Sequence, residues 1–170
     1  AGRSRAQLEE AVDNLGASVH VLCWPDQVLY EAVALREHID KACAILADVL
    51  LRPDFPADEA ERLRRELEAN LDELREDEAS LAQRFLAREL YGATHPYGLP
   101  VGGTEKTVAD LTLDQASGWV REFVRMGNVT FGIAGDLSRK ESEALLARHF
   151  TTAPNALPDG PAHVLAFPDP

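Results

Sequence analysis

The sequence predicts an α+β fold, with an antiparallel sheet and helices packed mainly on one face of it. Two short strand patterns follow one another near the N-terminus, separated only by a turn, and such close succession is typical of antiparallel hairpins. Most of the remaining chain reads as helices in clusters, not as helices that alternate strictly with strands. This clustering favours α+β over α/β organisation.

The first predicted elements are a helix and a hairpin. Ser4-x-x-Gln7 is a capping box that opens the helix, and Gly16 supplies its C-terminal stop. Strand-forming residues over 17–35 flank a turn at 24–27, which contains a proline. We therefore expect two antiparallel strands, with that proline confined to the turn.

Helical periodicity governs most of the remaining chain. It predicts five further helices, over residues 37–51, 56–76, 80–91, 112–124 and 138–149. Capping boxes at Thr112-x-x-Gln115 and Ser138-x-x-Glu141 open the last two of these.

Two later segments read as strands, Asn128–Gly135 and His163–Phe167, and the second lies in a tail rich in proline and glycine. We expect a single domain over residues 1–152, incomplete at its N-terminus because no strand precedes the opening helix. Residues 153–170 are expected to be a linker and the start of a following segment.

Composition excludes several classes of function. The net charge of −12 argues against nucleic acid or an anionic membrane surface as a partner. No apolar run approaches the roughly 20 residues that span a bilayer, so we expect a soluble chain, cytoplasmic or periplasmic. Cys23 and Cys43 are too few for a disulfide framework, and we expect both to be small buried hydrophobes.

The long acidic helix over 56–76 carries two glutamates of interest. Its apolar stripe consists of Ala60, Leu63, Leu67, Leu71 and Leu74. Glu66 and Glu73 lie two turns apart along one border of this stripe. They are either boundary charges that pair with Arg62 or Arg65 along the helix, or carboxylates that can turn inward to a metal.

Several short motifs along the chain are weak signals individually, but the order in which they occur is informative about the protein family. They are the helix from Arg3 to Gly16-Ala17, the Glu66/Glu73 pair, Leu90-Tyr91-Gly92, His95-Pro96-Tyr97-Gly98, Gly103-Thr104-Glu105 and Gly135-Asp136-Leu137. This order resembles the pitrilysin/insulinase family of zinc metallopeptidases, including mitochondrial-processing-peptidase-like members, whose inverted motif is H-x-x-E-H. The resemblance covers nearly the whole chain and implies a LuxS/MPP-like metallopeptidase half-domain.

The resemblance also implies a role for each glutamate. Glu73 matches the third zinc ligand, which completes two-His-one-Glu coordination, and Glu66 matches the residue that supports the site from nearby. None of the five histidines lies in an H-x-x-E-H motif: they are His20, His38, His95, His149 and His163. Truncation and true loss of the motif both remain open. Zinc is expected in the intact active enzyme, but none bound to this chain alone.

The resemblance implies that the chain is a domain of a zinc metallopeptidase that acts in peptide or protein hydrolysis. The enzyme would be a processing protease of the bacterial type. The isolated chain is not expected to be catalytic, because the general base and two ligands are missing. The alternative is an inactive-type homologous domain that forms the chamber wall and binds substrate for an active partner. A helical scaffold unrelated to peptidases is a third alternative.

Expected partners are a homologous peptidase domain or subunit and a peptide substrate, with a homodimer as a further alternative. His20 and Tyr30 lie on the strands that would face substrate, where an extended peptide could add as a strand. The simpler interpretations are a half-exposed strand residue for His20 and hairpin packing for Tyr30. His95 is expected to cap its loop and to hydrogen-bond the backbone.

Overall fold

The computed structural model describes residues 4–124 and 128–150, which belong to two compact units. The first unit contains the described residues of Ala1–Leu22, Leu29–Asp54 and Trp119–Gly160. The second contains the described residues of Cys23–Val28 and Phe55–Gly118.

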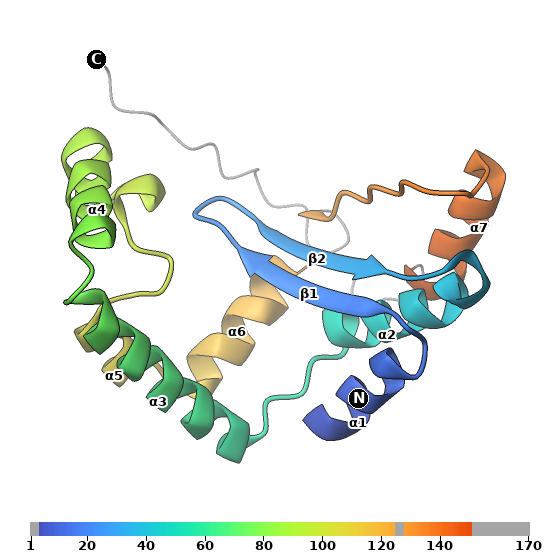
Figure 1. The fold of residues 1–170 in the computed structure, drawn as a ribbon, viewed down its shortest axis with the longest axis horizontal. Coiled ribbons are helices and arrows are strands. Elements are labelled where there is room, and N and C mark those ends of the chain that lie inside the picture. The colour runs from blue at the N-terminus through green and yellow to red at the C-terminus, as the bar shows by residue number, and fades with distance from the viewer. Residues whose placement is uncertain (1–3, 125–127, 151–170) are drawn as a thin grey trace. The chain divides into compact units, whose positions relative to one another are not determined.

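The elements follow one another as shown in Figure 1. They are α1 (Arg5–Asp13), β1 (Ser18–Cys23), β2 (Val28–Val33), the 3-10 helix η1 (Arg36–His38), α2 (Ile39–Leu51), α3 (Ala57–Leu74), α4 (Glu78–Tyr91), the 3-10 helix η2 (Pro96–Gly98), α5 (Glu105–Asp110), α6 (Leu113–Phe123) and α7 (Arg139–Phe150).

The sheet consists of β1 and β2, which pair as an antiparallel hairpin. The turn is closed by the backbone N–H of Trp24, which donates to the carbonyl of Gln27 over 2.8 Å. Along β2 the side chains alternate between half-buried and exposed, as they do when one face of a strand is covered. The predicted α+β class is confirmed.

The core of the first unit is built around α2. This helix buries Ala42, Cys43, Ile45, Ala47 and Leu50. Phe150 of α7, 2 % exposed, forms a cluster with Ala47 and Leu50, and Tyr30 of β2 packs against it. The ring of Phe131 lies 4.8 Å from the ring of Phe150, measured between centroids. Helix, strand and coil thus share one apolar centre.

Helix starts follow the capping signals in the sequence. At Ser4 the side chain accepts from the N–H of Gln7, and the Gln7 side chain accepts from the N–H of Ser4. The same reciprocal pair forms between Thr112 and Gln115 and between Ser138 and Glu141. All three predicted capping boxes are therefore confirmed, because they need only residues three positions apart.

The capping box of α5 was not predicted from the sequence. Thr104 is the N-cap residue of this helix: its hydroxyl accepts a hydrogen bond from the N–H of Thr107, and Thr107 Oγ1 accepts one from the N–H of Thr104. A threonine here takes the place that glutamate or glutamine holds in the usual box. Asp77 similarly caps α4 by accepting from the N–H groups of Ala79 and Ser80.

Two predictions are wrong. Residues 128–135 do not form a strand and run toward α7 (Figure 1). Within the described ranges only β1 and β2 pair in a sheet, and a strand needs a neighbour to satisfy its backbone groups. Cys23 is exposed at the end of β1, whereas Cys43 is buried as predicted. The predicted strand at 163–167 and the predicted linker at 153–170 lie outside the described residues.

The second unit has a thin core. Among its described residues only Leu71 of α3 and Val108 of α5 are buried hydrophobic side chains. Arg64 of α3 stabilises the C-terminal end of α5, because its guanidinium donates to the carbonyls of Ala109 (3.0 Å) and Leu111 (2.5 Å). Hydrogen bonds from one side chain thus add to the small apolar contact area of these helices.

Candidate functional site

Glu66 and Glu73 both lie on α3, and both are exposed. The apolar stripe that was expected to hold this face against a core is only partly covered. Leu71 is 8 % exposed and Ala60, Leu67 and Leu74 are half-buried, but Leu63 is 48 % exposed, so the stripe is open to solvent at Leu63. The two carboxylates therefore lie beside a helix face that the described residues do not fully bury.

Glu66 is engaged in a ladder of charges along α3. Its carboxylate lies 2.8 Å from Nη1 of Arg62, and Nε of Arg62 donates to Glu59 over 2.9 Å. The hydrogen bond to Glu59, and to a lesser extent the one to Glu66, raises the pKa of the Arg62 guanidinium. The pairing with Arg62 is one of the two that helical spacing predicts.

Glu73 is different. Across the described residues, no hydrogen bond or ion pair engages its carboxylate. The neighbouring Asp72 pairs with Arg75 over 3.1 Å. Glu73 is thus an ionisable group on α3 whose carboxylate is engaged by none of the described residues.

The described residues do not form a metal centre on their own. No group of three or more His, Cys, Asp or Glu side chains in the described part of the chain is placed to hold a metal ion. The ligand set of a catalytic zinc site needs three protein groups. The donors within the described ranges therefore do not fit zinc without further ligands.

His95 belongs to an aromatic cluster that follows α4. Its Nδ1 accepts a hydrogen bond from the backbone N–H of Tyr97 over 3.2 Å, which confirms the predicted loop-capping role. The rings of Tyr91, His95 and Tyr97 lie 5.5–5.7 Å apart between centroids. Stacking and capping together hold this imidazole in the loop.

The same loop is fastened to the tip of the hairpin. The Tyr97 hydroxyl donates to Oδ2 of Asp26 over 2.6 Å. This hydrogen bond raises the pKa of the Tyr97 phenol, because losing the proton would place two negative charges side by side. Gly98 is required next to it, since a Cβ there would come within 1.9 Å of the Gly92 carbonyl oxygen.

The two proposed substrate-edge residues have different surroundings. His20 on β1 is exposed. Tyr30 on β2 is half-buried and packs against the Ala47–Leu50–Phe150 cluster. His20 is therefore open to a ligand along the hairpin, whereas much of Tyr30 is occupied by packing.

A further ionic cluster, not foreseen from the sequence, joins α2 to α7. Asp40 accepts from Nη1 of Arg148 (2.5 Å) and lies 3.0 Å from Nε2 of His149. The pKa of Asp40 is held below its ordinary value, mainly by the hydrogen bond to His149 and further by the contact with Arg148. The partners are more than a hundred residues apart, so no local pattern could have indicated them.

Within the described ranges, no helix has the length and apolar character needed to cross a membrane.

A family model described as insulinase, peptidase family M16, matches residues 1–105. That range includes α3 and the aromatic loop. The match therefore covers both glutamates and most of the motifs that carried the resemblance.

Curated relatives carry corresponding names. The chain is 24 % identical over 136 residues to the "uncharacterized zinc protease YmxG" of Bacillus subtilis, which covers 80 % of this chain and 33 % of that protein. It is 26 % identical over 153 residues to a probable mitochondrial-processing peptidase subunit beta of Schizosaccharomyces pombe, covering 87 % and 32 %. The chain thus spans about a third of the length of these relatives.

Solved structures show the same fold. A peptidase M16 inactive domain from Pseudomonas fluorescens matches with a TM-score of 0.85 and 28 % identity, over 99 % of this chain and 40 % of that one. A protease from Helicobacter pylori matches with a TM-score of 0.84 at 17 % identity, over 98 % and 40 %.

Proposed function

Because the chain belongs to the insulinase family of peptidases, M16, we propose that it is a domain of a zinc metallopeptidase that acts in peptide or protein hydrolysis. The observation that carries this proposal is the state of Glu73. Its carboxylate is exposed on α3, and no described side chain engages it. A ligand that completes a metal site from another segment has to be available in this way.

In this proposal Glu73 is the third protein ligand of a site whose two imidazoles belong to an H-x-x-E-H motif. Zinc bound there would polarise the scissile carbonyl and lower the pKa of a water molecule. Glu66 supports the site from the same helix, held in place by Arg62. The motif does not occur in the 170 residues, so the isolated chain is proposed to be inactive.

A second candidate function corresponds to the description of one solved structure. The structure from Pseudomonas fluorescens is described as an inactive domain, at 28 % identity. A domain of that kind would form chamber wall and bind peptide for an active homologous domain or subunit. The exposed strand β1 with His20 is the surface proposed for the peptide.

The experiment that decides between them uses the natural full-length protein. Zinc content and cleavage of an unstructured peptide are measured for the wild type and for Glu73→Gln, with Glu68→Gln as matched control. Glu68 is also an exposed α3 glutamate without a side-chain partner in the described residues. The proposal expects stoichiometric zinc and cleavage, both sharply reduced only in Glu73→Gln.

Absence of zinc, with no effect of Glu73→Gln, would contradict the zinc-ligand role and favour the inactive-type domain. That function has its own readout: the protein should then raise the activity of a homologous active subunit when the two are mixed. Loss of zinc in both variants would mean that the helix, not Glu73, had been perturbed.

A further inference from the structure

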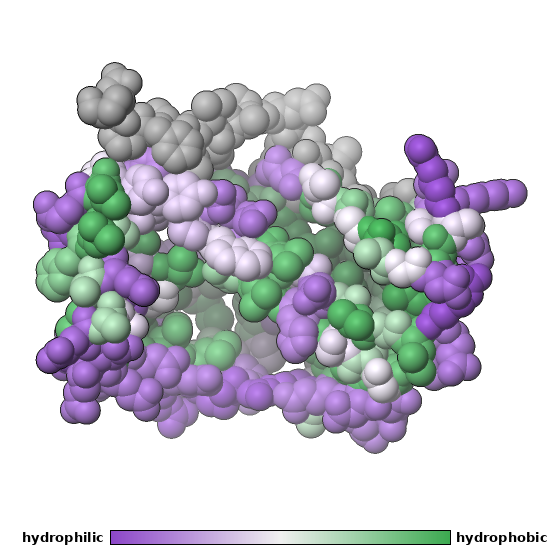
Figure 2. All heavy atoms as spheres, turned by 45° about the horizontal axis from the view of Figure 1, so that its top comes forward, coloured by the Kyte–Doolittle hydropathy of each residue, from purple (hydrophilic) through white to green (hydrophobic). Residues whose placement is uncertain are grey.

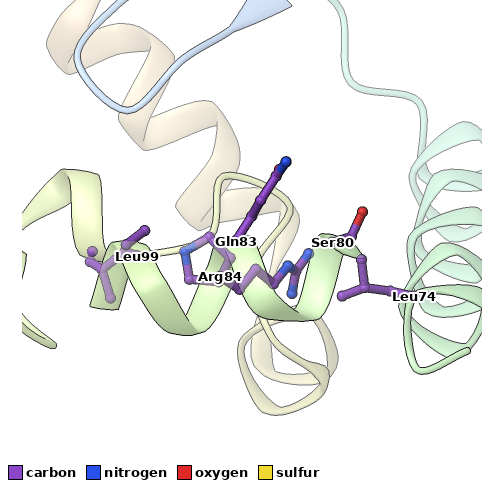
Figure 3. A pocket seen from close by; sticks show the side chains of 8 residues that line it. Leu74, Ser80, Gln83, Arg84 and Leu99 are labelled. Atoms are coloured by element: carbon purple, nitrogen blue, oxygen red, sulfur yellow. The ribbon is translucent and has the colours of Figure 1, made fainter. Parts of the chain in front are cut away.

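A pocket of about 360 Å³ lies in the second unit, and neither Glu66 nor Glu73 is among the residues that line it. Its walls are Leu74 from α3, Ser80, Gln83, Arg84 and Ala87 from α4, and Gly98, Leu99 and Pro100 after the aromatic loop. This volume lies in the range of about 300–1,000 Å³ that is typical of ligand sites. Figure 3 shows the Arg84 side chain reaching along the pocket toward Leu74 and Ser80.

Arg84 is the one cation that lines this pocket, and nothing in the described ranges neutralises it. Its side chain is half-buried, and no described carboxylate or carbonyl hydrogen-bonds or ion-pairs with it. Asp77, the acid that caps the same helix, is already occupied by the N–H groups of Ala79 and Ser80 and by the Ser80 hydroxyl at 2.6 Å. A half-buried guanidinium without a counter-charge favours an anionic ligand.

The other arginine at the C-terminal part of α4 makes this contrast clearer. Arg88, one turn further along, is exposed and does not line the pocket. The outer surface of α4 carries exposed apolar side chains, including Phe85 and Leu86, and Figure 2 shows hydrophobic side chains on this helix at the left of the view. Arg84 therefore presents its charge inside a partly apolar hollow.

We propose that this pocket binds the C-terminal end of a peptide, with the α-carboxylate on Arg84 and an aliphatic last side chain against Leu74, Ala87 and Leu99. The planar guanidinium matches a carboxylate in bidentate geometry. A chain end carries its carboxylate and its apolar side chain on one residue, so both fit a single compact pocket. An internal aspartate or glutamate would have to bring backbone in on both sides.

The site does not depend on zinc or on cleavage, so it is tested by binding alone. Fluorescence anisotropy with the 170-residue chain compares three short labelled peptides at 150 mM salt, where charges beyond about 8 Å are screened. One ends in leucine with a free carboxylate, one in leucine amide, and one in leucine amide with an internal glutamate. The acid is expected to bind about tenfold more tightly than either amide.

Arg84→Gln should remove this preference, whereas Arg88→Gln on the same helix should preserve it. Ala87→Leu, which fills the pocket without changing its charge, should also weaken binding of the peptide that ends in a free carboxylate. Circular dichroism of each variant checks that the fold is kept. The proposal would be overturned if the wild type bound the leucine acid no more tightly than the leucine amide or the internal-glutamate peptide. It would also be overturned if a folded Arg84→Gln protein kept the preference for the acid.

Discussion

The hydroxyl of Tyr97 donates a 2.6 Å hydrogen bond to the carboxylate of Asp26, 71 residues earlier in the chain. Asp26 is in the hairpin turn, and Tyr97 is in the 3-10 helix that follows α4. The bond fixes the aromatic loop to that turn, and it is the basis of the first prediction.

Tyr97 should lose its phenolic proton at a higher pH than an ordinary tyrosine does. Its pKa is raised above the ordinary value of 10.0, chiefly by the bond to Asp26. Because the folded pKa is raised, the stability that it contributes is present below pH 10 and is lost as the pH rises through the folded value. Absorbance at 295 nm should show a late-titrating phenol that is absent in Tyr97→Phe and shifted to lower pH in Asp26→Asn. An unchanged titration in Asp26→Asn would contradict the assignment.

Asp40 should stabilise the first unit at neutral pH but not in acid. Its pKa is held below the ordinary 3.8, first by His149 and also by Arg148. A lowered pKa gives stability that is present above pH 3.8 and is lost as the pH falls through the folded value. Urea unfolding should show that Asp40→Asn is less stable than the wild type at pH 7, with the difference shrinking below pH 4. Asp13→Asn, which removes an exposed carboxylate without an ion pair among the described residues, is the control and should lower stability at pH 7 less than Asp40→Asn does.

Phe150→Ala should destabilise the first unit strongly. Phe150 is 2 % exposed and packs against Ala47, Leu50 and Phe131, so its truncation leaves a cavity that costs roughly 3–5 kcal/mol. Phe85→Ala is the matched control, since Phe85 is 64 % exposed and surface changes usually stay within about 0.5 kcal/mol. If chemical denaturation gave similar losses in the free energy of unfolding for the two variants, Phe150 would not belong to the core of the first unit.

Alanine substitutions at two glycines should have opposite effects. Gly98→Ala would place a Cβ 1.9 Å from the Gly92 carbonyl oxygen, so the loop has to move and stability should fall. Gly118→Ala, within α6, meets nothing within 4 Å and should stabilise the protein by up to about 1 kcal/mol through helix propensity. Thermal unfolding of both variants checks this, and a neutral Gly98→Ala would show that the close approach is absent in solution.

Much of the local structure could be predicted because it depends on residues that are close in sequence. Ser4 and Gln7 form their capping box with no help from the rest of the chain, and Arg62 meets Glu66 because helical geometry places residues four apart together. The hairpin followed from two strand patterns around a turn. The family resemblance, carried by motifs in order, was confirmed by the match over residues 1–105.

Other features depended on contacts that no sequence pattern encodes. Residues 128–135 have strand-forming composition but form no strand, because a strand needs a partner to satisfy its backbone groups and no described strand pairs with them. The role of Glu73 as a zinc ligand stays a prediction, since its other ligands would come from an H-x-x-E-H motif.

The sequence by itself determined the helix starts at three capping boxes, the hairpin, the acidic helix with its two glutamates and the family. Only the tertiary structure decided that Asp40 meets His149 across 109 residues and that Tyr97 meets Asp26 across 71. It also decided that Arg84 lines a pocket while Arg88 does not. The physical reason is range: capping and i,i+4 pairs are fixed by backbone geometry, whereas these contacts exist only after the chain has closed long loops.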